Sequence, residues 1–193
     1  MTRVKPTEMK TGRLEVIIGP MFAGKSTKLI EIANRYESIQ KHILTITHII
    51  DNRYGEGVIS SHNHIQKKCM TTDLLEKILK NPDYKASEIV VIEEGQFFAD
   101  LKSFVIRAVD MDKKHVIVGG LSGDYQRKPF GQILELIPIA DSVQKISAFC
   151  KICNDGTEAH FTKRIISGNM ETQTLVGSND IYMPVCRNHY LSN

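Results

Sequence analysis

Tryptophan is absent from this chain of 193 residues, and aromatic side chains make up only 7% of it. Long hydrophobic runs are also absent: no stretch approaches the roughly eighteen consecutive apolar residues of a membrane-spanning helix. The first eleven residues are polar and lack the apolar run of a secretory signal. The sequence therefore predicts a soluble, cytoplasmic protein without a membrane partner.

A strong excess of charge of one sign is missing as well. The chain has 25 Lys and Arg against 22 Asp and Glu, for a formal net charge of +3, and its basic pairs Lys67-Lys68 and Lys113-Lys114 are isolated. Such a mild balance gives no indication of nucleic-acid binding. With 41% hydrophobic residues, the chain is long enough for one ordinary core and a small appendage.

Cysteine is scarce, with four residues in all. Cys150-x2-Cys153 and Cys186-x2-His189 form two pairs with metal-ligand spacing, so a metal site in a reducing compartment is favoured over a disulfide framework. Three thiolates and an imidazole suit a closed, structural Zn²⁺ site. A redox role for the first pair is the alternative, which the second pair disfavours. Cys69 is expected to be an ordinary packed thiol.

The most informative stretch is Gly-Pro-Met-Phe-Ala-Gly-Lys-Ser at residues 19–26, between a strand-like run at 14–18 and a helix-like run at 26–38. It fits the pattern Gly-x4-Gly-Lys-Ser of a phosphate-binding loop, in which backbone N–H groups and a helix N-terminus hold phosphates. Lys25 would contact the outer phosphates and Ser26 the Mg²⁺ ion. A strand-to-helix turn that binds nothing is the alternative, but the flanking patterns favour a nucleoside triphosphate site.

Strand and helix patterns alternate along the following residues. Further strands are expected at 42–50, 88–92 and 115–119, helices at 73–79, 101–112 and 134–140, and a loop or hairpin at 55–71. This order predicts an α/β fold with a right-handed, doubly wound, mostly parallel sheet. Three parts are expected: a polar tail at 1–11, a P-loop domain at 12–142, and a small zinc-binding β domain at 143–193 with a Gly/Ser/Asn-rich excursion.

Chemistry-bearing residues follow several of these strands. Glu93-Glu94 directly follows a buried strand, and because strand residues alternate in direction, one carboxylate could face Mg²⁺ and the other an acceptor hydroxyl. An acidic strand end entering a solvated turn is the alternative interpretation. Phe97-Phe98, Tyr125 and Phe130 could line a slot for a planar base, although such aromatics are more commonly core residues.

Five motifs then occur in a fixed order: Gly-Pro-Met-Phe-Ala-Gly-Lys-Ser-Thr, Asp-Asn-Arg-Tyr, Glu-Glu-Gly-Gln-Phe-Phe, Gln-Arg-Lys-Pro-Phe-Gly and the Cys₃His set. In this order they resemble the zinc-containing, cytosolic type of thymidine kinase, over about residues 12–190. The resemblance implies a salvage enzyme that transfers the γ-phosphoryl group of ATP to the 5′-hydroxyl of thymidine, and commonly of deoxyuridine.

The resemblance also implies a role for each matching residue. Glu94 would be the general base, acting with Lys25 and Arg53. ATP and Mg²⁺ would contact Gly19, Pro20, Met21, Phe22, Ala23, Gly24, Lys25, Ser26, Asp51, Asn52, Arg53, Glu93 and Gln96, with Ser26 and Glu93 serving the Mg²⁺ ion. The nucleoside would contact Met21, Phe97, Leu121, Tyr125, Phe130, Thr162, Gln173, Thr174, Leu175, Val176, Gly177 and Tyr182. Zn²⁺ would be held by Cys150, Cys153, Cys186 and His189.

Residues 173–177 correspond to the family's lasso, which binds the pyrimidine mainly through backbone groups, while Tyr182 contacts the sugar. This chain departs from the family pattern at Glu93, where aspartate is more usual, and at Tyr125, where phenylalanine is frequent. The resemblance further implies a homotetramer that is inhibited by thymidine triphosphate.

Two other functions would also use a phosphate loop. A kinase for another nucleoside or for a nucleoside monophosphate is the first, but monophosphate kinases need several arginines around the acceptor phosphate, and the arginines here are scattered. A zinc-ribbon nucleic-acid-binding module attached to an ATPase is the second. It would require a basic, aromatic-rich face near the cysteines, where Asp155, Glu158 and Glu171 are interspersed instead.

Overall fold

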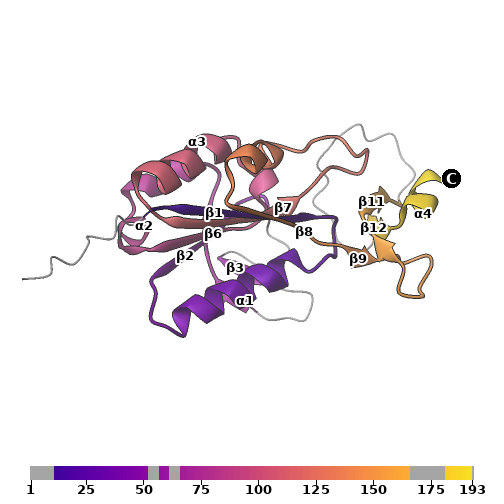
Figure 1. Cartoon of the computed structure of the whole chain (residues 1–193), viewed down its shortest axis with the longest axis horizontal. Helices are drawn as coiled ribbons and strands as arrows, with labels where there is room; N and C mark the ends of the chain where they lie inside the picture. Colours follow the sequence, from indigo (N-terminus) through magenta and orange to yellow (C-terminus); the bar gives the residue numbers. More distant parts are fainter. Residues whose placement is uncertain (1–10, 52–56, 61–65, 166–180, 193) are drawn as a thin grey trace, which may run out of the picture.

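The centre of the molecule is a six-stranded sheet (Figure 1). The computed structural model describes residues 11–51, 57–60, 66–165 and 181–192. Neighbouring strands are all parallel, in the order β5-β2-β6-β7-β1-β8. The strands are β1 (Arg13–Gly19), β2 (Ile43–His48), β5 (Met70–Thr72), β6 (Ile89–Ile92), β7 (His115–Leu121) and β8 (Ser142–Lys145). The predicted α/β fold with a parallel sheet is confirmed.

Helices cover both faces of this sheet, as the doubly wound prediction requires. In Figure 1, α1 (Lys25–Glu37) lies below the sheet, whereas α3 (Leu101–Ile106) lies above it. Tyr84 of the short helix α2 (Pro82–Ala86) belongs to the same core as Phe104 of α3. Alternate residues of the strands point to opposite faces of the sheet and belong to two separate hydrophobic cores. Ile17, Val91 and Ile117 pack with Leu29 and Ala33 of α1, while their neighbours along the strands pack with residues of α3 and of the 3₁₀ helices. The helix-like run predicted at 26–38 is therefore a helix with one apolar face packed on the sheet.

Several predicted elements take a different form. The helix expected at 73–79 is the 3₁₀ helix η1 (Leu75–Lys80), and Pro82 starts α2 instead of only ending a helix. Proline suits a first helical position, and the Asn81 side chain caps the helix by accepting the N–H of Asp83 at 2.7 Å. Beyond Ile106, α3 continues as the π-helical turn η3 (Arg107–Met111).

The stretches 55–71 and 134–140 were predicted as a loop or hairpin and as a helix, respectively. Within 55–71 there is an antiparallel hairpin of β3 (Val58–Ser60) and β4 (Gln66–Lys68). The edge strand β5 was not predicted, because its three residues are largely polar and pair on one side only. The segment before β8 is the 3₁₀ helix η4 (Ile133–Ile139), with Pro138 inside it.

After β8 the chain forms a small β-rich unit, here called the C-terminal module (residues 146–165 and 181–192). Its elements are β9 (Ala148–Phe149), β10 (Glu158–Ala159), β11 (Phe161–Arg164), β12 (Tyr182–Val185) and α4 (Arg187–Leu191). Ala148, Cys150, Ala159 and Val185 form its core. The domain boundaries predicted above remain predictions. Among the residues that the structure describes, no helix has the length and apolar character needed to cross a bilayer.

Parallel pairing decides where the functional residues gather. The register pairs Gly19 with Leu121, and Ile92 with both Val118 and Ile46. The carboxyl ends of β1, β2, β6 and β7 therefore open at one edge of the sheet, which is where open α/β sheets bind ligands. The short 3₁₀ helix η2 (Gly95–Phe97) follows β6 at this edge.

Candidate active site and metal centre

The predicted phosphate loop (residues 19–26) joins β1 to α1 through two residues in left-handed conformation. Phe22 has φ +65° and Gly24 has φ +82°. A Cβ at Gly24 would meet open space, so the glycine is required by its backbone angle and not by crowding. Gly24 is the N-cap of α1 and makes no side-chain cap, and the first turn contains no acidic residue. The N–H groups at the start of α1 are thus suited to an anion.

Lys25 lies over this loop. Its Nζ donates a hydrogen bond to the backbone oxygen of Pro20 at 2.8 Å, and its side chain is half-buried. The loop also contacts the C-terminal module, because the N–H of Met21 donates to Oγ1 of the buried Thr162 at 3.0 Å. Met21 and Thr162, two predicted acceptor-site residues, are therefore in direct contact.

The two predicted carboxylates occupy different environments. Glu93 is buried, with 4% of its surface exposed, and its N–H donates to the oxygen of Ile46 at 2.9 Å. Glu94 is half-buried and has φ +52°. The predicted alternation of the two side chains along a strand fails at Glu94, because β6 ends at Ile92 and a left-handed turn follows. This conformation costs a non-glycine residue roughly 1–3 kcal/mol and is concentrated at functional sites.

Gln96 connects Glu94 to the end of β7. Its Nε2 donates to Oε2 of Glu94 at 2.6 Å, and its Oε1 accepts the N–H of Leu121 at 3.0 Å. Gly120 and Gly131 pack so closely on Gln96 that a Cβ at either position would overlap it, and Gly131 also has φ +58°. This buried amide fixes the direction of the Glu94 carboxylate.

The aromatic residues predicted to contact the nucleoside, the phosphate acceptor, form two pairs at the same edge of the sheet. The rings of Phe97 and Phe130 meet edge to face with centroids 5.5 Å apart, and those of Tyr125 and Tyr182 lie 6.5 Å apart. The Arg164 guanidinium lies 5.2 Å from the Tyr125 ring centre. Tyr182 comes from the C-terminal module, so this module and the main sheet both contribute to the candidate site.

His48, which the sequence left without a role, organises the end of β2. Its Nδ1 accepts the N–H of Ile50 at 3.1 Å, and its backbone oxygen accepts the N–H of Asp51 at 2.9 Å. Its ring packs against Phe98 at 4.9 Å and Phe97 at 5.9 Å. Burial lowers the pKa of His48, which favours the neutral ring that this hydrogen bond needs.

Asp124 is a second residue that the sequence analysis missed. It is buried, and its Oδ1 accepts the N–H groups of Gln126 at 2.8 Å and Lys128 at 2.9 Å. An aspartate that accepts the N–H two residues later is typical of tight turns, so this local pattern could have been recognised. Asp124 thereby shapes the segment that carries Tyr125.

Part of the predicted site lies outside the described residues. This applies to Asn52 and Arg53, and to the predicted lasso residues Gln173, Thr174, Leu175, Val176 and Gly177. Their roles stay predictions.

The predicted metal ligands converge in the C-terminal module. One ligand atom from each of Cys150, Cys153, Cys186 and His189 lies within 4.8 Å of the others. His189 Nδ1 is 3.3 to 3.5 Å from the three sulfurs, and Sγ of Cys153 is 3.8 Å from that of Cys186. Tetrahedral ligands about 2.3 Å from Zn²⁺ are separated by about 3.8 Å, so the cluster has the size of a zinc site.

Two of the clustered thiols, Cys150 and Cys153, have pKa values shifted in opposite directions. Burial opposes ionisation of Cys150, but backbone N–H groups of Cys153 and Cys186 outweigh it and lower its pKa to about 6. Burial and then the contact with Cys150 raise the pKa of Cys153 to about 11. Cys69 is different: burial and then the Glu93 carboxylate raise its pKa to about 11, as expected for an ordinary packed thiol.

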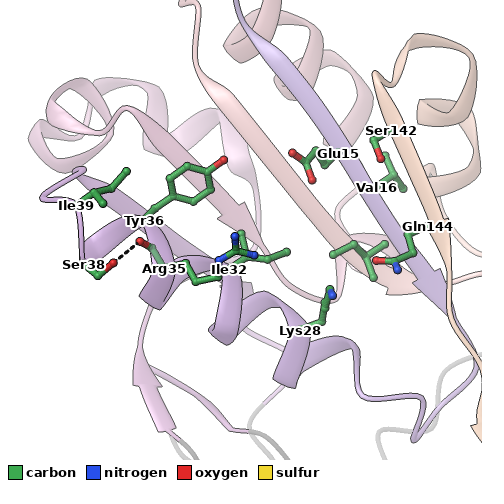
Figure 2. A pocket seen from close by; sticks show the side chains of 11 residues that line it. Glu15, Val16, Lys28, Ile32, Arg35, Tyr36, Ser38, Ile39, Ser142 and Gln144 are labelled. Carbon is green, nitrogen blue, oxygen red and sulfur yellow. Dashed lines mark hydrogen bonds between the residues drawn. The ribbon is translucent and has the colours of Figure 1, made fainter.

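The described residues form hollows beside α1, and two of them differ in their relation to the predicted site. The larger, of about 570 Å³, is bounded by α1, β1 and β8, with Glu15, Lys28, Arg35 and Gln144 among its lining residues (Figure 2). It contains none of the predicted site residues. The other hollow, of about 500 Å³, is lined by Ala23, Gly24, Thr27 and Lys145 and thus borders the phosphate loop. The second hollow, although smaller than the first, lies beside residues of the predicted phosphate loop.

Comparison with known proteins gives one consistent result. A family model described as thymidine kinase matches residues 12–190. A protein named "Thymidine kinase" from Oryza sativa subsp. japonica is 41% identical over 185 residues, which cover 93% of this chain and 66% of the rice protein. "Thymidine kinase a" of Arabidopsis thaliana is 40% identical over 190 residues, covering 95% of this chain and 76% of the plant protein. "Thymidine kinase" of vaccinia virus (strain Western Reserve) is 39% identical over 185 residues, covering 96% of this chain and 100% of the viral protein.

Proposed function

This chain belongs to the thymidine kinase family, and from that premise we propose that it transfers the γ-phosphoryl group of ATP to the 5′-hydroxyl of thymidine, and also of deoxyuridine. The observation that carries this proposal is the gathering, at one edge of the sheet, of a phosphate loop, a glutamate pair and two aromatic pairs. Phosphoryl transfer needs mainly positioning and charge neutralisation, which these groups can supply.

Each side of the reaction has its own residues in this proposal. The N-terminus of α1 and Lys25 hold the triphosphate, and Ser26 and Glu93 serve Mg²⁺, which neutralises developing charge when bound. Glu94 accepts the proton of the attacking 5′-hydroxyl. Its support is the hydrogen bond from Gln96, which orients the carboxylate while leaving it able to accept a further bond.

The nucleoside is proposed to lie between the aromatic pairs, with its pyrimidine held by the backbone of residues 173–177. Phe97 and Phe130 would supply apolar surface, and Tyr182 would contact the sugar. The family relationship also supports a cytoplasmic homotetramer that is inhibited by thymidine triphosphate, without nucleic-acid or membrane partners.

An acceptor panel tests the proposal. With ATP and Mg²⁺, thymidine and deoxyuridine are expected to be converted to monophosphates, whereas thymidine monophosphate, the acceptor of a monophosphate kinase, should not react. Product formation is followed by chromatography, and a duplex DNA titration runs alongside it. Failure to phosphorylate thymidine by folded, zinc-loaded protein, or tight DNA binding, would overturn the assignment.

The metal centre gives a separate prediction. Freshly purified protein, prepared without chelators, is expected to contain one zinc per chain, because the four ligand atoms have tetrahedral spacing. Cys153→Ser should lower zinc content and raise the KM for thymidine, since Thr162 and Tyr182 lie in the same module. Cys69→Ser is the matched control and should leave both unchanged. Metal analysis that finds no zinc in the parent protein contradicts the prediction.

A further inference from the structure

The segment 122–130, here called the Tyr125 loop, contacts the C-terminal module next to the metal centre. The hydroxyl of Tyr190 donates a hydrogen bond to the backbone oxygen of Tyr125 at 2.8 Å. The Arg127 guanidinium lies 4.5 Å from the Tyr190 ring centre and 5.8 Å from that of Phe161. Tyr190 directly follows His189, one of the four clustered ligands. The contact therefore joins the predicted nucleoside pocket to the predicted zinc centre.

Arg127 makes this contact from a strained backbone. Its φ is +64°, a left-handed conformation that is unfavourable for a residue with a Cβ. The turn holds it there: the N–H of Arg127 donates to the oxygen of Asp124 at 3.0 Å, and the buried Asp124 carboxylate fixes the flanking N–H groups. The conformation directs an exposed cation onto two aromatic rings, and this attraction offsets part of the strain.

Tyr190 is held from the other side by the metal-ligand cluster. Its N–H donates to the oxygen of Cys186 at 2.9 Å, and its ring lies 5.3 Å from that of Phe161. Tyr190 also packs, as Cys153 does, on the small core that contains Cys150. Ordering of the four ligands consequently fixes the ring and the hydroxyl of Tyr190.

We propose that Arg127 and Tyr190 are positioning residues that couple the zinc centre to the acceptor pocket, by holding Tyr125 in place against Tyr182. This inference rests on the proposed function, since Tyr125 and Tyr182 are acceptor-site residues in that proposal. The coupling is reciprocal by thermodynamic necessity: if zinc strengthens acceptor binding by some factor, acceptor binding strengthens zinc binding by the same factor.

The experiment uses two variants of the zinc-loaded enzyme and one matched control. Tyr190→Phe keeps the ring but removes the hydroxyl, and Arg127→Gly removes the guanidinium while accepting the positive φ. Arg187→Ala is the control, because Arg187 makes the same kind of contact within the module, with its guanidinium 4.8 Å from the Phe161 ring centre. Thermal unfolding verifies that all three are folded.

Zinc affinity is measured by competition with a chromogenic chelator, with and without thymidine. Thymidine should tighten zinc binding of the parent enzyme by about fivefold or more, in the usual range of allosteric coupling. Tyr190→Phe and Arg127→Gly should lose most of this effect, bind zinc more weakly without thymidine, and raise the KM for thymidine but not for ATP. Arg187→Ala should behave as the parent does.

The coupling is overturned if thymidine tightens zinc binding equally in the parent and both variants. It is also overturned if their zinc affinities without nucleoside are the same, or if Arg187→Ala changes these equally. Its failure is distinguishable from failure of the proposed function. A wrong function appears as absent thymidine turnover in the parent enzyme, whereas the comparison of zinc affinities without nucleoside needs no acceptor at all.

Discussion

Replacing Lys25 with alanine is expected to reduce phosphoryl transfer by at least about 10³-fold while leaving the fold intact, because a preorganised charge on the transferring group is lost. The structure supports the expectation that the fold stays intact. Lys25 belongs to neither sheet core, and its Nζ contacts a loop oxygen of Pro20. Single-turnover kinetics at saturating ATP measure the chemical step directly, and circular dichroism with thermal unfolding reports on the fold.

Lys28→Ala is the matched control for this variant, because it removes the same charge one turn further along α1, in a residue that lines the hollows beside the helix. Its turnover should stay within a few-fold of the parent. Near-normal turnover of a correctly folded Lys25→Ala enzyme would remove the phosphate loop from the mechanism.

Glu94→Gln is expected to lower kcat by roughly 10² to 10⁴-fold, the usual contribution of a general base, with nucleoside affinity little changed. The amide keeps the shape of the carboxylate and can still accept the hydrogen bond from Gln96, so the hydrogen-bonded connection to Leu121 should survive. Steady-state kinetics and a direct thymidine titration separate the loss of chemistry from any loss of binding.

Glu93→Gln should behave differently. Glu93 is buried and is proposed to support Mg²⁺, so its variant should need more Mg²⁺ and recover part of its activity when the metal is added. Glu94→Gln should not recover. A Mg²⁺ titration of both variants shows which glutamate supports Mg²⁺ and which is the general base. If added Mg²⁺ restored activity to Glu94→Gln alone, the roles of Glu93 and Glu94 would be reversed.

Local pattern was sufficient for much of this site. The phosphate loop could be proposed from its glycines, lysine and serine, which act through adjacent backbone geometry, and Gly24 has a positive φ in the structure. The four candidate metal ligands could be predicted because each of the two pairs has the short spacing that lets both side chains bind one ion. The structure brings the two pairs together. The resemblance added roles for Glu94 and Tyr182, which no local pattern could assign.

Other features depended on contacts between distant segments. His48 and Tyr190 carry no recognisable motif, and their partners Phe98 and Tyr125 are far away along the chain. The turn at Glu94 also escaped prediction, because a strand pattern gives no indication that its last carboxylate leaves the pleat with a positive φ.

The sequence by itself determined the α/β fold and predicted the phosphate loop and the metal-ligand set, since hydrophobic period and short spacings are local properties of a chain. Only the tertiary structure decided how the two carboxylates differ in burial, which aromatic rings pair, and that the Tyr125 loop rests on α4 beside the metal ligands. The physical reason is that these arrangements come from packing parallel strands and a separate module against each other, and such contacts join residues that no local period relates.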